Sequence, residues 1–349
     1  MSILPVVYEE VAEDLRREMS IQPKQFWWSV THTHAAPEVG PPSIYKALLG
    51  RSDHEWDREY TSLVKSSLIE AIKKARATLE PARLGLGQGI AFANINRRAK
   101  DVDGTVSLGL NPDGPADRQI GLIRLEKPDG SPIALVVNYA MHGTVLSGKN
   151  TLIGGDGPGT VSAYLEQKIG APVLYVNGAA GNLAPIYSVY DNERQGHLSQ
   201  FRVLLGDRVL AAASAMGPST ADVSISLGDK IIETPLKDGL TWPDDLAAYS
   251  RVENGRPLVR LPLRFLRLND TLIWSAPVEL LCEIAIEVRN QSPFPRTFYF
   301  GYTNGWLGYL PTAKAFQEGG YEPKTSPFTS QAEPDVLRGV IAYIQGLRR

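Results

Sequence analysis

Three of the five histidines in this 349-residue chain stand at the ends of apolar runs. His32 and His34 alternate in SVTHTHAAP, and His142 ends the run VVNYAMHGT. Side chains two positions apart on a strand share a face, so a strand that continues through Thr33 would point His32 and His34 into one cleft. Neutral imidazole is a common metal ligand, and a pair of polar residues at a turn is the alternative. These two motifs alone leave that choice open.

A zinc site built on two histidines usually needs an acidic ligand and an open position for water. Glu279, in SAPVELLCEI, follows a buried apolar run and a proline. We expect it in the first turn of a helix, where a glutamate can also simply complement the helix dipole. Asp156, in IGGDGPG, precedes a helical pattern, where an aspartate more often forms a turn or cap. Glu279 is therefore the better acidic candidate.

Composition excludes several classes of function. The chain has 43% hydrophobic and 21% charged residues and a net charge of −2, which predicts a globular protein and gives no reason to expect nucleic acid as a partner. A single cysteine, Cys282, excludes an intrachain disulfide and reads as a buried, inert thiol. No apolar run has membrane-spanning length. The N-terminal segment turns acidic too early for a secretory signal, so we expect a cytoplasmic protein; a start codon placed too late would hide a signal for secretion.

The elements that must position these residues follow from hydrophobic periodicity. Strand and helix patterns mix without a clean repeat and without a polar linker, which predicts an α/β fold of mixed sheets with flanking helices in a single large domain. Helices are expected over 7–19, 57–79, 160–170, 198–216 and 335–348 and from near 277; strands are expected over 21–30, 83–96, 118–126, 133–143, 171–178 and 298–303, with 220–275 mostly extended.

Seven motifs occur along the chain in a specific order: THTHAAP, ANINR, NYAMHGT, GGDGPG, NGAAGNLAP, APVEL and GYLPTAKAFQEGGYE. Together they resemble the catalytic domain of the neutral/alkaline non-lysosomal ceramidases over nearly the whole chain. The resemblance implies one catalytic domain over residues 1–349. Family members usually have further strands before T-H-T-H, and many carry an immunoglobulin-like domain after the catalytic one. We therefore expect either a compact version or a start codon placed too late.

The resemblance also implies a cofactor, a zinc ion (Zn²⁺). Its ligands would be His32, His142, Glu279 and Tyr309, which occupy the ligand positions of the family motifs. Tyrosine is an unusual zinc ligand, and residue spacing alone does not predict Tyr309.

By the same resemblance, His34, Arg97 and Tyr321 line the reacting centre. Metal-activated water would attack an amide carbonyl, which predicts hydrolysis of ceramide to sphingosine and a fatty acid. Arg97 and Tyr321 would donate hydrogen bonds to the carbonyl oxygen or to the released carboxylate. His34 could assist proton transfer to the leaving amine, and whether His34 or a tyrosine is the acid stays open.

One motif departs from the family. The family's Gly-Asp-Val-Ser-Pro segment appears here as GNLAP, with Asn182 in place of the acid and Ala184 in place of the serine. Together with Asp156, these two positions are expected to contact substrate. The lost serine weakens the claim to ceramide itself. A zinc amidase or esterase for another N-acyl or ester substrate, and a non-catalytic lipid-binding homologue, are the alternatives. The expected partner is a small molecule or lipid, with no nucleic acid and at most peripheral membrane contact.

Overall fold

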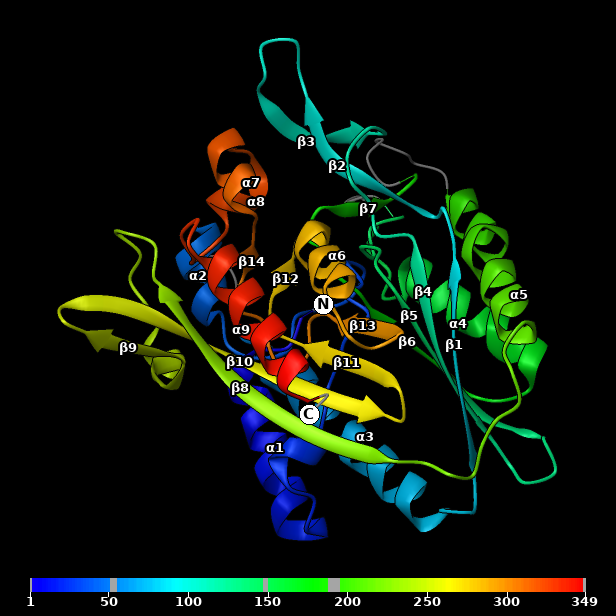
Figure 1. The fold of residues 1–349 in the computed structure, drawn as a ribbon. Helices are drawn as coiled ribbons and strands as arrows, with labels where there is room; N and C mark the ends of the chain where they lie inside the picture. Colours follow the sequence, from blue (N-terminus) through cyan, green and yellow to red (C-terminus); the bar gives the residue numbers. More distant parts are fainter. Residues whose placement is uncertain (1, 51–54, 147–149, 188–194, 348–349) are drawn as a thin grey trace.

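The computed structural model describes residues 2–50, 55–146, 150–187 and 195–347, and two sheets form its centre (Figure 1). The first has the strand order β1-β4-β5-β6. The first three strands pair antiparallel and β6 joins β5 in parallel. Their bounds are β1 Arg83–Ile90, β4 Gln119–Glu126, β5 Pro132–Tyr139 and β6 Val173–Asn177. Helix α4 (Asp156–Ile169) connects β5 to β6, and α5 (Arg208–Ser214) packs on β1.

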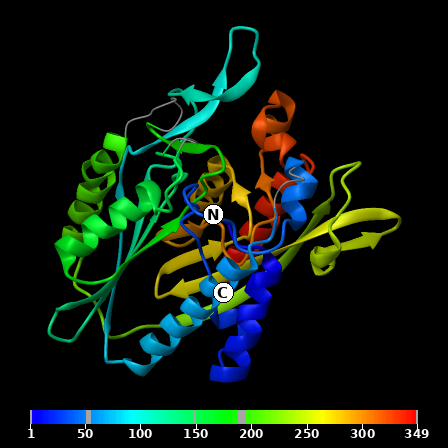
Figure 2. The same cartoon turned by 180° about the vertical axis from the view of Figure 1, so that it is seen from behind.

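The second sheet has the order β13-β11-β10-β8, and β9 also pairs with β10. Its strands are β8 Ile225–Pro235, β9 Ser250–Glu253, β10 Arg256–Leu268, β11 Thr271–Ser275 and β13 Arg296–Phe300. Phe265 of β10 stacks on Tyr343 of α9 (Ala332–Gly346), so α9 covers one face. Helix α6 (Cys282–Asn290) packs beside α9. Helix α1 (Pro5–Met19) lies on the opposite face, with α3 (Arg58–Ala77) beside it (Figure 2).

The two sheets meet at a shared apolar cluster that includes Ile123 and Val176 of the first sheet and Ile273 and Phe298 of the second. The Asn138 side chain of β5 donates to the Tyr299 carbonyl of β13 across the same junction. The chain continues from β5 to His142 and from β11 to Glu279. The junction between the two sheets therefore helps to set where these two residues lie.

Smaller elements complete the described chain. They are η1 Pro23–Gln25, α2 Ser43–Leu49, β2 Asn94–Lys100, β3 Val106–Asn111, β7 Leu183–Pro185, η2 Gln195–Gln200, η3 Arg202–Asp207, η4 Asp244–Tyr249, β12 Glu279–Leu280, β14 Tyr309–Leu310, α7 Ala313–Glu318 and α8 Tyr321–Lys324. Strands β3-β2-β7 form one small sheet and β12-β14 another. Among the described residues, no helix combines the length and apolarity needed to cross a membrane.

The α/β fold of mixed sheets with flanking helices is confirmed, and several element boundaries were wrong. Residues 21–30 contain the 3-10 turn η1 and an isolated bridge instead of a strand, because Pro23 begins the turn. The stretch 83–96 is two strands: the Tyr139 hydroxyl accepts from Ala93 N and donates to Ala91 O, where the chain leaves one sheet for another. Residues 198–216 divide into η2, η3 and α5 instead of one long helix. The extent of the catalytic domain, 1–349, stays a prediction.

Candidate metal centre

The two histidine motifs lie side by side, although not on the strand that the sequence predicts. Thr33 forms an isolated parallel bridge with Gly143, and His34 N donates to Gly143 O at 2.9 Å. His32 has a φ of 58°, which breaks an extended strand and overturns the expected alternation. A Cβ at position 143 would lie 2.7 Å from both His32 O and Thr33 Cα. Gly143 therefore permits the close approach that brings His142 to His32.

The ligand atoms of four side chains lie close together, and those of the three histidines are within 4.8 Å of one another. The Nε2 atoms of His32 and His34 are 3.2 Å apart. Glu279 Oε2 is 3.1 Å from His142 Nε2 and 3.5 Å from His32 Nε2. Ligands bound at ~2.0–2.1 Å in tetrahedral geometry lie about 3.3–3.4 Å from one another. These side chains therefore have the spacing of a group that could hold a metal ion.

The hydrogen bonds behind the rings support the same interpretation. His142 Nδ1 lies 2.7 Å from Ala180 O, so this nitrogen carries the proton and Nε2 has a free lone pair. Nε2 is buried and makes no hydrogen bond among the residues described, yet it faces Glu279 Oε2. Two acceptors so close are favourable only with a proton or a metal cation between them. Burial lowers the pKa of both His32 and His142, which favours the neutral form that binds metal.

Glu279 is held in place by neutral donors. Trp306 Nε1 donates to Oε1 at 2.8 Å, and the Tyr302 hydroxyl donates to Oε2 at 3.3 Å. The Tyr302 ring stacks on His32, with centroids 4.3 Å apart. Burial by itself raises the pKa of Glu279. A proton on His32 or His142, together with the charge of Arg97, outweighs burial and lowers that pKa well below its usual range. The carboxylate is therefore ionised.

The helical position expected for Glu279 is wrong. It lies in β12, and α6 begins only at Cys282. Strand β12 pairs in parallel with β14, and Glu279 is the register partner of Tyr309. This pairing places the two predicted ligands next to each other, which a helical turn would not do.

Arg97 lies beside this group and is fixed by a β-bulge in β2. The register shifts between Asn96 and Arg98, which breaks the usual alternation of side chains. Arg97 Nε and Arg98 Nη1 consequently both reach Glu322, at 3.0 and 2.6 Å from its two carboxylate oxygens. Arg97 Nη2 donates to the Tyr309 hydroxyl at 3.1 Å.

The rings of Tyr309 and Tyr321 lie beside Arg97. Their rings are 5.5 Å apart in an edge contact, and Arg97 lies 5.6 and 5.7 Å from the two ring centroids. Burial raises the pKa of Tyr309 well above its usual value. With no cation bound, Tyr309 is therefore a neutral phenol that accepts from Arg97.

A cleft of about 420 Å³ opens above these residues. It is lined by His32, His34, Glu279, Tyr309 and Tyr321 together with Ser2, Ala36, Pro37, Glu38, Tyr45, Leu49, Glu55, Asp57 and Trp306. Five sequence-predicted site residues thus share one cleft. Arg97 and His142 stand behind it, within contact of the lining residues.

The three positions expected to contact substrate lie outside the lining of this cleft. Asp156 is buried and accepts from Val145 N and Leu146 N at 2.8 Å each, as a loop and helix cap would. Asn182 Nδ2 donates to Glu283, and Asn182 Oδ1 accepts from Cys282 N. Ala184 is buried in β7. Among the described residues none of the three lines the cleft, and their substrate role stays a prediction.

Sequence reasoning missed Tyr302, Trp306, Arg98 and Glu322. Glu322 directly follows Tyr321, and Arg98 follows Arg97, so each lay next to a residue already singled out. Tyr302 and Trp306 lie in GYTNGW, a turn-rich segment with two aromatic residues after a strand. That combination is a usable signal, because aromatic N–H and O–H groups that become buried seek a hydrogen-bond partner.

Comparison with known proteins gives a consistent match. The family model described as "Neutral/alkaline non-lysosomal ceramidase, N-terminal" matches residues 2–182, more than half of the 349 residues. The chain is 28% identical over 179 residues to neutral ceramidase B of Dictyostelium discoideum, covering 49% of this chain and 23% of that protein. It is 27% identical over 193 residues to the neutral ceramidase of Pseudomonas aeruginosa, covering 50% and 28% respectively. The alignments thus span about a quarter of the length of these relatives.

The fold is similar over a longer range. The crystal structure of the Pseudomonas aeruginosa neutral ceramidase superimposes with a TM-score of 0.75 at 18% sequence identity. The match covers 99% of this chain and 65% of that one. The same architecture therefore extends beyond the half of the chain that sequence similarity reaches.

Proposed function

Because this chain belongs to the neutral/alkaline non-lysosomal ceramidase family, we propose that it is a zinc-dependent hydrolase that cleaves the amide bond of an N-acyl lipid, with ceramide as the first candidate. The observation that carries the proposal is the convergence of four side chains. The ligand atoms of His32, His34 and His142 lie within 4.8 Å of one another, and Glu279 Oε2 lies 3.1 Å from His142 Nε2 and 3.5 Å from His32 Nε2. Imidazole and carboxylate are the donors that a catalytic zinc site uses. The neutral ceramidases among its relatives make an N-acyl sphingolipid the natural first substrate.

Each residue then has a distinct task. His32, His142 and Glu279 would hold the metal, with Tyr309 beside Glu279 as the fourth ligand. When bound, a zinc ion lowers the pKa of a water toward ~7 and so supplies a nucleophile at neutral pH. Ala180 O orients the His142 ring, and Trp306 and Tyr302 orient the carboxylate of Glu279, as outer hydrogen bonds do in metal sites.

The substrate would be oriented by Arg97 and Tyr321. Tyr321 lines the cleft, and Arg97 is held beside it by Glu322. Arg97 and Tyr321 would donate to the oxygen on which negative charge develops. His34 is the exposed imidazole of the cluster and can exchange a proton with the leaving amine. Its Nε2 is also placed to be a ligand, so its two roles compete for one atom.

A specific observation favours a second candidate substrate. Three carboxylate side chains, Glu38, Glu55 and Asp57, line the cleft, whose volume is about 420 Å³. Acidic side chains in the cleft suit a polar or cationic N-acyl compound better than a molecule with two long alkyl chains. Ala184, at the position where the family has a serine, also favours a substrate other than ceramide. The alternative is therefore a zinc amidase for a shorter, more polar N-acyl substrate.

One experiment tests the proposal and separates the substrates. Protein purified without chelator is analysed for metal by mass spectrometry and assayed with C12-ceramide beside a short-chain N-acyl compound that carries a cationic group. We expect stoichiometric zinc and hydrolysis of at least one substrate class, both lost in His142→Ala. His197→Ala is the matched control, because His197 stacks on Tyr187 and does not line the cleft. Protein without zinc, or zinc-loaded protein inactive on every substrate, would overturn the proposal.

A further inference from the structure

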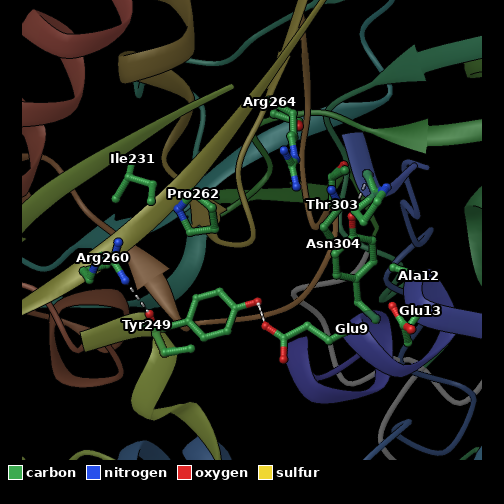
Figure 3. Close-up of a pocket in the computed structure, with 14 residues that line it drawn as sticks. Glu9, Ala12, Glu13, Ile231, Tyr249, Arg260, Pro262, Arg264, Thr303 and Asn304 are labelled. Carbon is green, nitrogen blue, oxygen red and sulfur yellow. Dashed lines mark hydrogen bonds between the residues drawn. The ribbon is translucent and has the colours of Figure 1, made fainter. Parts of the chain in front are cut away.

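A second cavity, of about 310 Å³, lies between α1 and the face of the second sheet opposite α9 (Figure 3). Helix α1 contributes Tyr8 and Glu9, strand β10 contributes Pro262 and Arg264, and β11 contributes Ser275. None of its lining residues lines the cleft of the metal centre. The two cavities are therefore separate places on the molecule.

One end of this cavity presents unused hydrogen-bond donors. Ser275 is 1% exposed, and its Oγ has no hydrogen-bond partner in the part of the chain that the structure describes. Asn304 uses its Oδ1 to accept from Trp28 N, and no hydrogen bond from its Nδ2 is found among the described residues. A buried hydroxyl without a partner is unfavourable unless a ligand or water satisfies it. Ser275 therefore indicates a polar occupant, and the Asn304 amide is a second donor at the same place.

Arg264 adds a positive charge at the same end. It is the register partner of Ser275, so the two side chains share a face of the sheet. The guanidinium points into the space between Pro262 and Thr303 (Figure 3). Within 4 Å its one carboxylate neighbour among the described residues is Asp229, at 3.9 Å. It also lies near the Tyr8 hydroxyl, where it opposes the burial that raises the pKa of Tyr8.

The two acidic residues that line the cavity already have hydrogen-bond partners. Glu13 binds Arg16 through both carboxylate oxygens. Glu9 accepts from the Tyr249 hydroxyl at 2.8 Å (Figure 3). Between the two ends the wall is apolar, formed by Ala12, Ile231 and Pro262. Arg260 also lines the cavity, beside Tyr249, where it donates to Ala248 O (Figure 3). The cavity thus combines a donor-rich, positive end at Arg264 with an apolar wall.

We propose that this cavity binds a small carboxylate with an apolar body, its carboxylate group at Arg264, Ser275 and Asn304. A guanidinium and a carboxylate form charge-assisted hydrogen bonds, which are the strongest available here. The hydroxyl and amide satisfy the remaining carboxylate lone pairs, and the apolar body packs on Pro262 and Ile231. Short fatty acids and apolar amino acids share this chemistry.

Binding is measured by calorimetry on the full chain with hexanoate, L-leucine and hexanol as probes. We expect saturable binding of hexanoate, leucine or both, and affinity for hexanol lower by about tenfold or more, because the alcohol lacks the charge-assisted bonds. Hexanoate binding alone identifies the fatty-acid class. Leucine binding alone identifies the amino acid class. No saturable binding of either carboxylate would overturn the proposal.

Substitutions of the lining residues test whether the ligand binds in this cavity. Arg264→Gln should weaken binding by about tenfold or more, and Ser275→Ala by a smaller factor. Arg256→Gln, an exposed position on the same strand, is the matched control and should keep the affinity. Binding should also persist in His142→Ala, which excludes a carboxylate bound at a metal and makes the result independent of the proposed hydrolase. Binding that Arg264→Gln leaves unchanged would contradict the assignment, provided circular dichroism shows both variants folded.

Discussion

Glu279 and Glu322 are both nearly completely buried, with 2% and 1% of their surface exposed, but the groups that surround them differ. Glu322 contacts two guanidinium groups, those of Arg97 and Arg98. Within 4 Å, Glu279 has the imidazoles of His32 and His142 as its ionisable partners among the described residues. Its other donors, on Tyr302 and Trp306, are neutral.

The difference shows what each carboxylate is for. A buried charge is costly unless an opposite charge or several hydrogen bonds compensate it. Glu322 carries its own permanent cations, so its role is to fix Arg97. Neutral imidazoles give Glu279 no permanent cation, and the lone pair of His142 Nε2 faces it. The second arrangement suits a site that becomes electrostatically balanced when a metal ion enters.

The largest effect is expected from loss of a metal ligand. Glu279→Gln and His142→Ala should each lower metal affinity by more than about 100-fold, since replacing an outer partner already costs 10–100-fold. Turnover should disappear with the metal. Metal content after dialysis, measured beside turnover, tests this. Full metal occupancy in either variant would show that the cluster is not the binding site.

Glu322→Gln should act on stability instead. It leaves the Arg97 and Arg98 guanidiniums buried without their shared counter-charge, which is expected to cost about 3–5 kcal/mol in the free energy of unfolding. Urea denaturation with chelator present measures this loss. Glu279→Gln is the matched control under the same conditions, and its loss should be much smaller because no permanent cation is left unpaired. Equal losses in the two variants would remove the distinction between the two glutamates.

Arg97→Ala should lower turnover while the metal stays bound. Removal of one donor to a developing oxyanion typically costs about 10²–10³ in kcat. Glu322 keeps Arg98 as a partner, so the fold should persist. Steady-state kinetics and metal analysis on the same sample distinguish the two effects. Release of the metal in this variant would assign Arg97 to the metal site instead.

The smallest effect is expected from Tyr302→Phe. The change removes the 3.3 Å hydrogen bond to Glu279 and keeps the ring stacked on His32. Metal affinity should fall by about tenfold, at the lower end of the range for outer hydrogen bonds. Competition with a chromogenic chelator measures it. If affinity is unchanged, Trp306 alone orients the carboxylate.

Much of the candidate centre was predictable because chemistry-bearing residues follow apolar runs. His32, His34 and His142 were expected to meet, and the structure brings them together. The predicted reason was wrong: a positive φ at His32 and the absent side chain of Gly143 achieve the contact, without a strand. Backbone exceptions of this kind have no periodic pattern, so hydrophobic periodicity cannot reveal them.

The sequence by itself determined the α/β class, the apolar runs that become most of the strands, and the histidines and glutamate that could serve as metal ligands; Tyr309 was implied only by the family resemblance. Local patterns and residue types carry that information. Tertiary structure alone decided the partners. Glu279 lies beside Tyr309 because two short strands pair across thirty positions of chain. Arg97 and Arg98 share Glu322, which lies more than 200 positions later in the chain, because a bulge in β2 turns both arginines toward it. Such contacts depend on long-range packing, which no local pattern encodes.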